Sequence, residues 1–542
     1  MNTFDQQSLC DVVQERAERD PHGLALVELR DEHDLCLSWG QLAEQADRAA
    51  TTLLDLGVRP GESVMVQLPN SIDFVVMSLA TLRIGAVCCP VLPILGQREL
   101  VYVLERSRAR VLVTPADFRG RQHAREALEL AAAGRTAHLR HLLVTGGTAS
   151  LTDERCGIRQ VPRLGVHDLA ARIAATPAGP LTGVGERSLH DVAHLLFTSG
   201  TTGEPKGVPH RMRTLNQAVS LMSRRVGLTA DDRVHIASPM AHHSGFLYGM
   251  WLSLLLGCVQ VIQPVWNAPL ALRAFAQWRG TFMQGAAPFL LDMVTAVHNA
   301  QPAPHSLRTF VVTGAAVPRR LAAEARDVLG ARICAAWGST ETCMATLSAP
   351  QDDLGTVADG RPLDGVRVRA VDEGGIDVGT GREGLLEVTG PFVFDGYLDR
   401  DDLTAEAFTA DGWYRSGDLA VIEPSGCVRI TGRVKDVVNR GGEKIPVGEI
   451  EQILLAHPAI RDAAIVAMPD LRLGERACLF AVTHPGRVIK LEDVQSHLAT
   501  HMVTKSFWPE HIEFIDELPR NPAGKIQKYL LREIARGVAA SA

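Results

Sequence analysis

Cysteine pairs at metal-binding spacing are absent from this chain. Ten cysteines occur among its 542 residues, but no two are separated as C-x-x-C, and the adjacent Cys88 and Cys89 lie within an apolar run. Structural zinc sites and disulfide frameworks both depend on recurrent cysteine spacings, so the pattern supports neither of them. We expect reduced thiols in the protein core.

A strong charge of either sign is also missing. The sequence has 62 acidic and 55 basic residues, which gives a net charge of −7, and it contains no basic block. Nucleic acids and anionic membranes are therefore not expected as primary partners. The beginning of the chain, MNTFDQQSLCDVVQERAERD, mixes acids and bases without an apolar segment. Because an export signal requires such a segment, we expect a cytoplasmic protein.

One apolar stretch is long enough to raise the question of a membrane span. Gly245 to Ile262 form 18 residues without a charge, which is close to the shortest helix that can span a bilayer. Gly257 divides the stretch into a leucine-rich part and a β-branched part that ends at Pro264. This division predicts a buried helix followed by a buried strand, and no membrane span is expected.

The order of the apolar runs predicts the fold class. From about residue 24 to 390, helical patterns alternate with short apolar runs such as ESVMVQL, ARVLVT, HLLVT, DRVHIAS, CVQVIQ and TFVVTG. Strands that alternate with helices at this spacing form βαβ units, so we predict an α/β domain of mixed, mostly parallel sheets. Segment 146–190 has few apolar clusters and is interpreted as a surface excursion.

The C-terminal part of the chain follows a different pattern. REGLLEVTG and GWYRSGDLAVIEPSGCVRITG predict a small β unit with glycine-containing turns. The helical VGEIEQILLAHP and LEDVQSHLATHM then flank the strand-like IRDAAIVAMPD and RACLFAVTHP, which predicts a small α+β domain. We therefore expect an N-terminal domain over residues 1–432, a hinge over 433–436 and a mobile C-terminal domain over 437–542. Composition alone fits an ordinary polar linker equally well.

The stretch FTSGTTGEPKG, Phe197 to Gly207, predicts a phosphate-binding loop. It combines four hydroxyl side chains, three glycines and one lysine directly after the apolar run VAHLL. Glycine permits close approach to the backbone, hydroxyls and N–H groups donate to phosphate oxygens, and the lysine adds a cation. The spacing differs from G-x-x-x-x-G-K-[ST], so the loop is not a P-loop of the ATPase kind.

This loop resembles the signature loop of the adenylate-forming enzymes, which comprise acyl-CoA synthetases, nonribosomal adenylation domains and luciferases. Further segments resemble that superfamily in the expected order, namely AWGSTET, GWYRSGD, GRVKDVVNRGGEKI and LPRNPAGKIQK. The resemblance covers the chain from about residue 20 to 535. Within the superfamily, PMAHHSGFLYG, PVWNAPLAL, GAAPFLLDM and FWPE are similar to cyclohexanecarboxylate-CoA ligases and related medium-chain ligases.

The resemblance implies a catalytic set on both predicted domains. Lys525 would reach the reacting α-phosphate and carboxylate during adenylation and leave when the small domain rotates about Lys435. Further catalytic residues implied are Lys206, Arg433 and His242.

The resemblance also implies a nucleotide site. Asp418 would accept the ribose hydroxyls, and Trp337 stands where relatives usually have tyrosine beside the adenine. Glu341 with Thr201 would hold Mg²⁺, an ion that binds one or two carboxylates together with substrate oxygens. The residues implied for binding ATP and CoA are Thr198, Ser199, Gly200, Thr201, Thr202, Gly203, Lys206, Gly207, Gly314, Ala315, Ala316, Trp337, Gly338, Ser339, Thr340, Asp418, Arg433, Gly441 and Gly442.

The acid-binding pocket is implied next to the adjacent pair His242 and His243. We expect His242 near the substrate carboxylate, whereas a metal site at the pair is disfavoured because no further cysteine or aspartate lies nearby in the sequence. The residues implied for the acid are His242, His243, Phe246, Leu247, Phe289, Leu290, Gly314 and Gly338.

The leading hypothesis is an acid-CoA ligase that uses ATP, Mg²⁺ and CoA. It would convert a bulky, alicyclic or terpenoid carboxylate to an acyl-adenylate and then to a thioester. A freestanding aryl-acid adenylating enzyme that loads a carrier-protein phosphopantetheine is the alternative, although such enzymes carry asparagine near the gating position. A third hypothesis is a nucleotide-binding homologue without catalysis, against which the simultaneous presence of Lys206, Glu341, Asp418, Arg433 and Lys525 counts.

Overall fold

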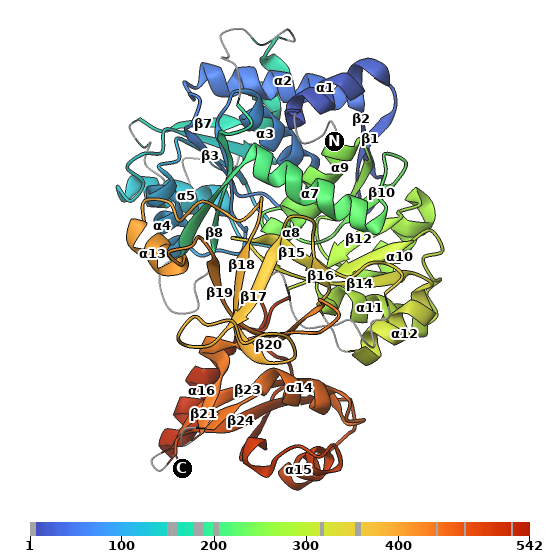
Figure 1. The fold of residues 1–542 in the computed structure, drawn as a ribbon. Coiled ribbons are helices and arrows are strands. Elements are labelled where there is room, and N and C mark those ends of the chain that lie inside the picture. The colour runs from blue at the N-terminus through green and yellow to red at the C-terminus, as the bar shows by residue number, and fades with distance from the viewer. Residues whose placement is uncertain are drawn as a thin grey trace.

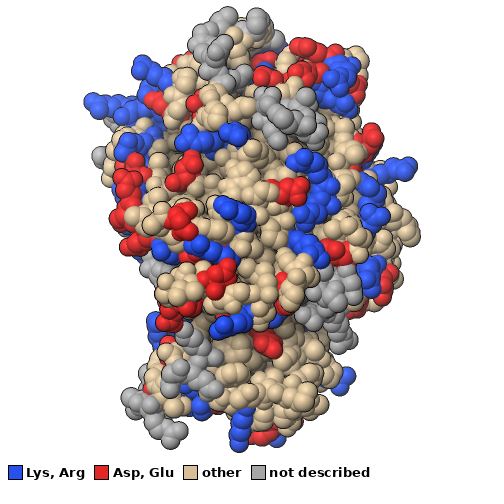
Figure 2. Space-filling view, in the orientation of Figure 1, with Lys and Arg blue, Asp and Glu red and all other residues tan. Residues whose placement is uncertain are grey.

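A computed structural model describes most of the chain. The described residues are 7–148, 151, 161, 163–177, 179, 181, 188–198, 205–314, 319–352, 359–440, 443–470, 473–521 and 524–541. Figure 1 shows a large N-terminal domain above a small C-terminal one. On the face seen in Figure 2, acidic and basic side chains are interspersed over both.

The first large sheet holds the predicted loop at one edge. Its neighbouring strands are parallel except for the last pair, β8 and β9, which is antiparallel. In spatial order the strands are β7 (Gly165–Asp168), β6 (His141–Thr145), β5 (Val111–Pro115), β3 (Ser63–Val66), β4 (Val87–Pro90), β8 (Val192–Thr198) and β9 (Lys206–Arg211).

The second large sheet has a parallel centre and antiparallel edges. Its order is β16 (Arg361–Pro362), β15 (Cys343–Leu347), β14 (Arg332–Ser339), β13 (Thr309–Val312), β12 (Phe282–Gly285), β10 (Arg233–Ile236), β11 (Val259–Ile262), β1 (Leu24–Glu28) and β2 (Leu35–Ser38). The six strands from β14 to β1 are parallel neighbours. Both sheets together confirm the predicted class of mostly parallel α/β structure.

Helices cover the two sheets, as Figure 1 shows. They are α1 (Leu9–Arg19), α2 (Trp39–Asp55), α3 (Ile72–Arg83), α4 (Gln97–Ser107), α5 (His123–Ala132), α6 (Leu169–Ala175), α7 (Met212–Val226), α10 (Ala268–Trp278), α11 (Ala287–His298) and α12 (Arg319–Leu329). Helix α3 contacts β1 of one sheet and β3 and β4 of the other. Its residues are buried on all sides except at Asp73, because a helix between two sheets has no solvent face.

The long uncharged stretch folds as predicted into helix followed by strand. Its helical part begins at the last residue of α8 (His243–Gly245) and continues through the π-helical η4 (Phe246–Trp251) and α9 (Leu252–Leu256). Gly257 ends the helix at φ +70°, a left-handed conformation that glycine adopts without a side-chain clash. β11 then enters the parallel centre of the second sheet. Among the described helices, none has the length and apolar character needed to cross a bilayer.

Segment 146–190 contains more regular structure than the sequence suggested. β7 pairs with β6 at the edge of the first sheet and leads into α6. β7 has no fully buried residue, and in α6 only Leu169 is buried. The described part of the segment is half-exposed, in keeping with the predicted surface excursion, but β7 and α6 were not predicted, since these edge elements lack the apolar periodicity that would have revealed them.

A four-stranded antiparallel unit closes the large domain. It consists of β17 (Arg367–Val371), β18 (Glu383–Thr389), β19 (Tyr414–Ile422) and β20 (Val428–Arg433), with α13 (Asp401–Ala407) in the connection from β18 to β19. The register of β19 and β20 places Asp418 directly opposite Arg433. Two sequence motifs that are separate along the chain are thereby brought side by side.

The small domain has its own sheet and its own core clusters. Its elements are β21 (Val438–Arg440), β22 (Glu443–Ile445), α14 (Val447–Leu455), β23 (Ile460–Asp470), β24 (Gly474–Thr483), α15 (Leu491–Thr500), η6 (Lys505–Phe507), β25 (His511–Phe514) and α16 (Lys528–Ser541). The single-turn η5 (Val434–Asp436) lies between β20 and this sheet, at the predicted hinge. The exact domain boundaries remain a prediction.

Candidate active site

Asp418 lies at the centre of a buried polar cluster. Nε of Arg433 is 2.8 Å from Oδ1 of Asp418, and the indole Nε1 of Trp337 donates a hydrogen bond of 3.0 Å to Oδ2. The Asp418 side chain is only 3% exposed. Oδ1 accepts no well-aligned hydrogen bond from the described residues, so this buried acceptor can still take a hydroxyl donor. Burial raises the pKa of Asp418, and the cations Arg433 and Lys525 oppose that rise.

Lys525 reaches this cluster from the small domain. Burial, followed by the nearby Arg433, lowers the pKa of Lys525 to about 8, and the carboxylates of Asp418, Asp436 and Glu341 act in the opposite direction. The ammonium group therefore lies within electrostatic range of groups from both domains. The Lys525 N–H donates to Oδ1 of Asn521 at 2.9 Å, which fixes the turn that carries the side chain.

The turn next to Lys525 packs closely against the large domain. Gly524 has φ +82°, and a Cβ at this position would lie 3.1 Å from Cβ of Ala286 and 3.4 Å from Cγ of Pro288, at the start of α11. A side chain at position 524 would be strained by the positive φ and crowded by the start of α11. Glycine thus allows the small domain to place Lys525 beside the large domain.

Lys206 and Glu341 are connected through a tyrosine that no sequence motif had indicated. Nζ of Lys206 lies 4.6 Å from the ring centroid of Tyr397, a cation–π distance. The Tyr397 hydroxyl donates to Oε1 of Glu341 at 3.1 Å. Burial, with the Glu341 carboxylate, raises the pKa of Tyr397, so the phenol remains a proton donor. Tyr397 therefore orients the carboxylate that we expect to hold a metal ion.

Part of the predicted phosphate loop lies outside the described residues. Thr198 pairs with Lys206 and Phe197 with Gly207, so the loop connects the antiparallel strands β8 and β9. The predicted site residues outside the description are Ser199, Gly200, Thr201, Thr202, Gly203, Ala315, Ala316, Gly441 and Gly442, as is the side chain of Lys435.

The remaining predicted nucleotide residues lie at or just beyond the C-terminal ends of β13 and β14. Gly314, directly beyond β13, has φ +90°. A Cβ on Gly338 would lie 1.8 Å from the carbonyl oxygen of Cys343. Only glycine therefore fits at this point, where β14 lies against β15. The Ser339 N–H donates to Oγ1 of Thr342 at 3.0 Å, and the Thr340 carbonyl accepts from the ring of His210.

His242 is the N-cap of the short helix α8, and its imidazole lies within electrostatic range of Lys525. Its Nδ1 accepts a hydrogen bond from the Ser244 N–H at 3.3 Å and lies 2.9 Å from the Ser244 hydroxyl. Burial, with the nearby Lys525 charge, lowers the pKa of His242 to about 4. At neutral pH the ring is uncharged, and Nε2 carries its proton.

His243 belongs to a different environment from its neighbour in the sequence. It is 4% exposed and lies between His210 and His194, with ring-centroid distances of 5.2 and 5.7 Å. Neither ring nitrogen has a hydrogen-bond partner among the described residues. The sulfur of Cys343 and one ring nitrogen each of His243 and His210 lie within 4.8 Å of one another. The expectation that no cysteine lies nearby was wrong in space, because Cys343 is a hundred positions away along the chain.

The apolar residues predicted for the acid pocket do not form one cluster. Phe246 and Leu247 are buried in the core between the sheets, where Phe246 meets His194 at 4.2 Å between ring centroids. Phe289 and Leu290 belong to a second cluster, where Phe289 contacts Trp266 edge-on at 4.6 Å.

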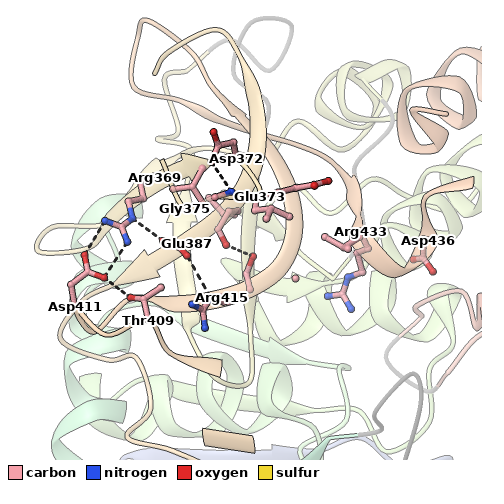
Figure 3. A pocket seen from close by; sticks show the side chains of 17 residues that line it. Arg369, Asp372, Glu373, Gly375, Glu387, Thr409, Asp411, Arg415, Arg433 and Asp436 are labelled. Carbon is pink, nitrogen blue, oxygen red and sulfur yellow. Dashed lines mark hydrogen bonds and ion pairs between the residues drawn. The ribbon is translucent and has the colours of Figure 1, made fainter. Parts of the chain in front are cut away.

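A cavity of about 630 Å³ lies beside Arg433 on the antiparallel unit. Figure 3 shows Arg369 and Arg415 with Glu387 and Asp411 on one side, and Arg433 and Asp436 on the other. Arg369 bonds Glu387 at 2.7 Å and Asp411 at 3.0 Å. Arg369 is thus paired with two carboxylates, which makes it less available to a phosphate than an unpaired cation would be.

Two protein-family models match this chain, one in each domain. A family model described as AMP-binding enzyme matches residues 13–398, and one described as AMP-binding enzyme C-terminal domain matches residues 449–525. The chain is 35% identical to a medium-chain fatty-acid–CoA ligase of Escherichia coli K12 over 530 residues, which cover 97% of this chain and 90% of the relative.

Two further relatives carry other substrate names. A salicylyl-CoA synthase / salicylate adenylyltransferase of Streptomyces sp is 32% identical and covers 94% of this chain and 91% of its own length. A CoA ligase named for an octahydro-indenyl propanoate, from Mycobacterium tuberculosis, is 33% identical and covers 91% and 93%. Among solved structures, ATP-bound MatB from Rhodopseudomonas palustris superposes with a TM-score of 0.85 at 26% identity, covering 98% of this chain and all of that one.

Proposed function

We propose that this chain, which belongs to the AMP-binding enzyme family, is an acid-CoA ligase that activates a carboxylate with ATP and transfers the acyl group to CoA. The observation that carries the proposal is the position of Lys525. Its ammonium lies within electrostatic range of Asp418, Arg433, Glu341 and His242, although it comes from the other domain. A site assembled from two domains can be taken apart again by domain rotation.

In the first half-reaction, a carboxylate oxygen attacks the α-phosphorus of ATP and pyrophosphate leaves. Negative charge accumulates where two anions meet, so positioned cations lower the barrier. Lys525 would supply one cation there, and Lys206 and Arg433 would supply others. His242 is uncharged at neutral pH, and its Nε2–H can donate to the carboxylate.

In the second half-reaction, the CoA sulfur attacks the acyl carbon, AMP leaves with the electron pair of the broken C–O bond, and the thiol proton passes to solvent. We propose that the small domain turns about Lys435 between the two steps. Lys525 would then withdraw from the reaction centre. Gly441 and Gly442 would line the path of the pantetheine arm.

The nucleotide would bind against Asp418 and Trp337. Oδ1 of Asp418 is ion-paired with Arg433, but among the described residues no donor forms a well-aligned hydrogen bond to it. This buried oxygen is therefore suited to accept a ribose hydroxyl. The Trp337 ring is held by its N–H bond to Asp418, which would leave the face of the indole for the adenine base. Gly314, at φ +90°, would allow the base to approach the backbone.

Glu341 is the residue we propose for Mg²⁺, with Thr201 as a second ligand. Tyr397 donates a hydrogen bond to Oε1 of the Glu341 carboxylate, so Oε2 would be the oxygen offered to the ion. Mg²⁺ prefers hard oxygen ligands such as a carboxylate. The ion would offset the repulsion between the negative charges of Glu341 and the phosphate oxygens. ATP, Mg²⁺ and CoA are thus the small molecules proposed for the site.

The acid we propose is bulky and alicyclic or terpenoid. The name of the octahydro-indenyl propanoate ligase supports a ring system, whereas the medium-chain ligase supports a linear acid. One observation favours a second candidate, the aryl-acid enzyme that loads a carrier protein. Among the described residues, neither ring nitrogen of His243 has a hydrogen-bond partner, and one of them could accept a hydrogen bond from the phenol of a salicylate-like acid. The name of the salicylyl-CoA synthase agrees with this alternative.

The experiment is a comparison of kcat/KM with CoA for cyclohexanecarboxylate, a polycyclic acid, octanoate and 2,3-dihydroxybenzoate. Pyrophosphate release reports adenylation, and thiol consumption reports transfer. We expect an alicyclic acid to lead and neighbouring ring sizes to differ by about 1 to 3 kcal/mol per methylene. A tenfold lead of dihydroxybenzoate, roughly 1.4 kcal/mol, would transfer the assignment to the aryl-acid enzyme. Absence of pyrophosphate release with every acid would favour the non-catalytic homologue.

A further inference from the structure

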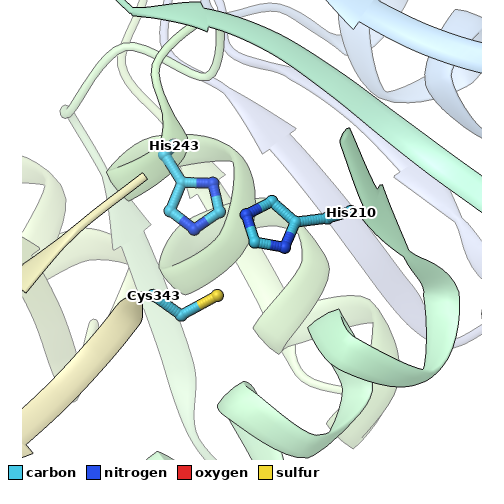
Figure 4. Close-up of side chains that lie close together, drawn as sticks. All are labelled: His210, His243 and Cys343. Atoms are coloured by element: carbon cyan, nitrogen blue, oxygen red, sulfur yellow. The ribbon is translucent and has the colours of Figure 1, made fainter. Parts of the chain in front are cut away.

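Three potential metal ligands meet in the core beside the proposed acid pocket. They are His210 from β9, His243 from α8 and Cys343 from the start of β15, and their ligand atoms all lie within 4.8 Å of one another. All three residues are buried, at 1%, 4% and 2% exposure. Figure 4 shows the sulfur of Cys343 pointing toward the two imidazoles.

His210 is held in the orientation of a metal ligand. Its Nε2 lies 2.6 Å from the Thr340 carbonyl oxygen, so Nε2 carries the proton and donates to that oxygen. Nδ1 consequently carries a lone pair, and it has no partner among the described residues. A ligating histidine in a metal site typically donates its other N–H to a carbonyl or carboxylate in this way.

His243 provides the second, independent sign that something is bound here. Both of its ring nitrogens are unpartnered among the described residues, although the side chain is 96% buried. An unsatisfied buried polar group is rare in native proteins because it loses its hydrogen bonds to water without replacement.

Cys343 occupies a backbone conformation that its residue type does not favour. Its φ is +50°, in the left-handed region where glycine would be unstrained. Such strained positions cluster at functional sites, where other interactions hold them.

From this geometry we propose that Nδ1 of His210, one ring nitrogen of His243 and Sγ of Cys343 bind a zinc-like divalent transition-metal ion. Two imidazoles and a thiolate suit Zn²⁺ or Co²⁺ and do not suit Mg²⁺ or Ca²⁺, which take oxygen ligands. On binding, the Cys343 thiol would release its proton to solvent, and the thiolate would offset one of the two positive charges.

The spacing is close to that of a tetrahedral site. Bonds of about 2.0 to 2.3 Å would place the ligand atoms roughly 3.3 to 3.7 Å apart, so the side chains have to close by about an ångström from the 4.8 Å limit. A fourth position would stay open to water or to a polar group of the bound acid. The second ring nitrogen of His243 would also remain free. This site does not depend on the proposed ligase activity.

The test uses full-length, untagged protein in which the exposed Cys36 has been replaced by serine, so that this surface thiol cannot bind metal. The protein is freed of metal with a chelator, and Co²⁺ is added while the absorption spectrum is recorded. We expect close to one equivalent of Co²⁺ to bind, with a thiolate-to-cobalt charge-transfer band in the near ultraviolet. Zn²⁺ should displace the cobalt and abolish the band.

Two ligand variants and one matched control separate the proposal from its alternatives. Cys343→Gly removes the sulfur and relieves the positive φ, so the chain should fold. His210→Gln removes a nitrogen ligand. Loss of a residue that only hydrogen-bonds to a metal ligand weakens metal affinity by roughly 10- to 100-fold. Loss of a ligand itself, as in each of these variants, should weaken it by more. The control Cys478→Ala, a buried cysteine of the small domain, should leave the band unchanged.

The same spectra can overturn the proposal. If Co²⁺ gives no thiolate-to-cobalt band with the wild-type protein, the site is excluded. The imidazoles without partners would then hydrogen-bond to water or substrate instead. A band that persists in Cys343→Gly shows that another cysteine binds the ion. If Cys343→Gly unfolds, the absence of the band in a folded His210→Gln still supports the site, and its presence contradicts it.

Discussion

The nucleotide side of the site and the histidine cluster beside the acid pocket are built in opposite ways. Around Asp418, opposite charges face one another across the domain junction, and sequence motifs indicated nearly every member. Around His243, neutral rings with unpartnered nitrogens meet inside the core, and no motif indicated His210 or Cys343. The comparison teaches that motifs reveal charged residues in a shared site, whereas neutral residues that meet only through packing leave no such signal in the sequence. The predictions below test each side, from the largest expected effect to the smallest.

Lys525→Ala should remove adenylation while leaving thioester formation from supplied acyl-adenylate largely intact. Loss of a positioned charge costs about 3 to 4 kcal/mol of transition-state stabilisation, by analogy with oxyanion-hole deletions. Pyrophosphate release and thioester yield measure the two half-reactions separately. Lys505→Ala, at an exposed lysine of the same domain, is the control and should change neither. Equal loss of both half-reactions would contradict a lysine that acts in only one conformation.

Lys435→Pro should block the second half-reaction and preserve the first. Proline is tolerated in the first turn of a helix such as η5, yet its fixed φ removes the freedom that a hinge requires. Thioester formation should fall by roughly 100-fold, the size of loss that a misplaced group causes. Lys435→Ala keeps the backbone free and serves as the matched control. Wild-type thioester yield from the proline variant would remove the hinge assignment.

Asp418→Asn should weaken ATP binding more than it slows turnover. Hydrogen bonds to a charged group contribute about 1.5 to 3 kcal/mol, so we expect KM for ATP to rise about 10- to 100-fold with a smaller change in kcat. Asp55→Asn, at an exposed aspartate in α2, controls for charge loss alone. An unchanged KM for ATP would show that the ribose binds elsewhere. The nucleotide site, like the histidine cluster, would then lack an assigned ligand contact.

The rate of adenylation should fall as pH rises above about 8. Burial lowers the pKa of Lys525 to about 8, so the catalytic cation is present below that pH and is lost above it, by about tenfold per pH unit. His242, whose pKa burial lowers to about 4, should contribute only an acidic limb near pH 4. Lys525→Arg keeps the charge at all these pH values, so the alkaline decline should disappear in whatever activity this variant retains. A decline near pH 6.5 in the wild type would point to an unperturbed histidine instead.

The fold was predictable wherever the signal was local. Runs such as HLLVT and TFVVTG became the buried parallel strands β6 and β13, because a fully buried strand needs an unbroken apolar run. β7 was not predicted, because a short, half-exposed edge strand has no such apolar run. The motifs likewise identified Asp418, Arg433 and Trp337. Their mutual contacts required the register of β19 and β20, which no single segment contains.

The sequence by itself determined the family, the fold class, the two-domain order and the residue types available for phosphate, ribose and metal, because these depend on short segments. Only the tertiary structure decided which side chains meet. It brought Lys525 to Asp418 from the other domain, inserted Tyr397 between Lys206 and Glu341, and placed Cys343 beside His243. The physical reason is that such contacts depend on strand register, crossing backbones and domain packing, which join residues that are remote along the chain.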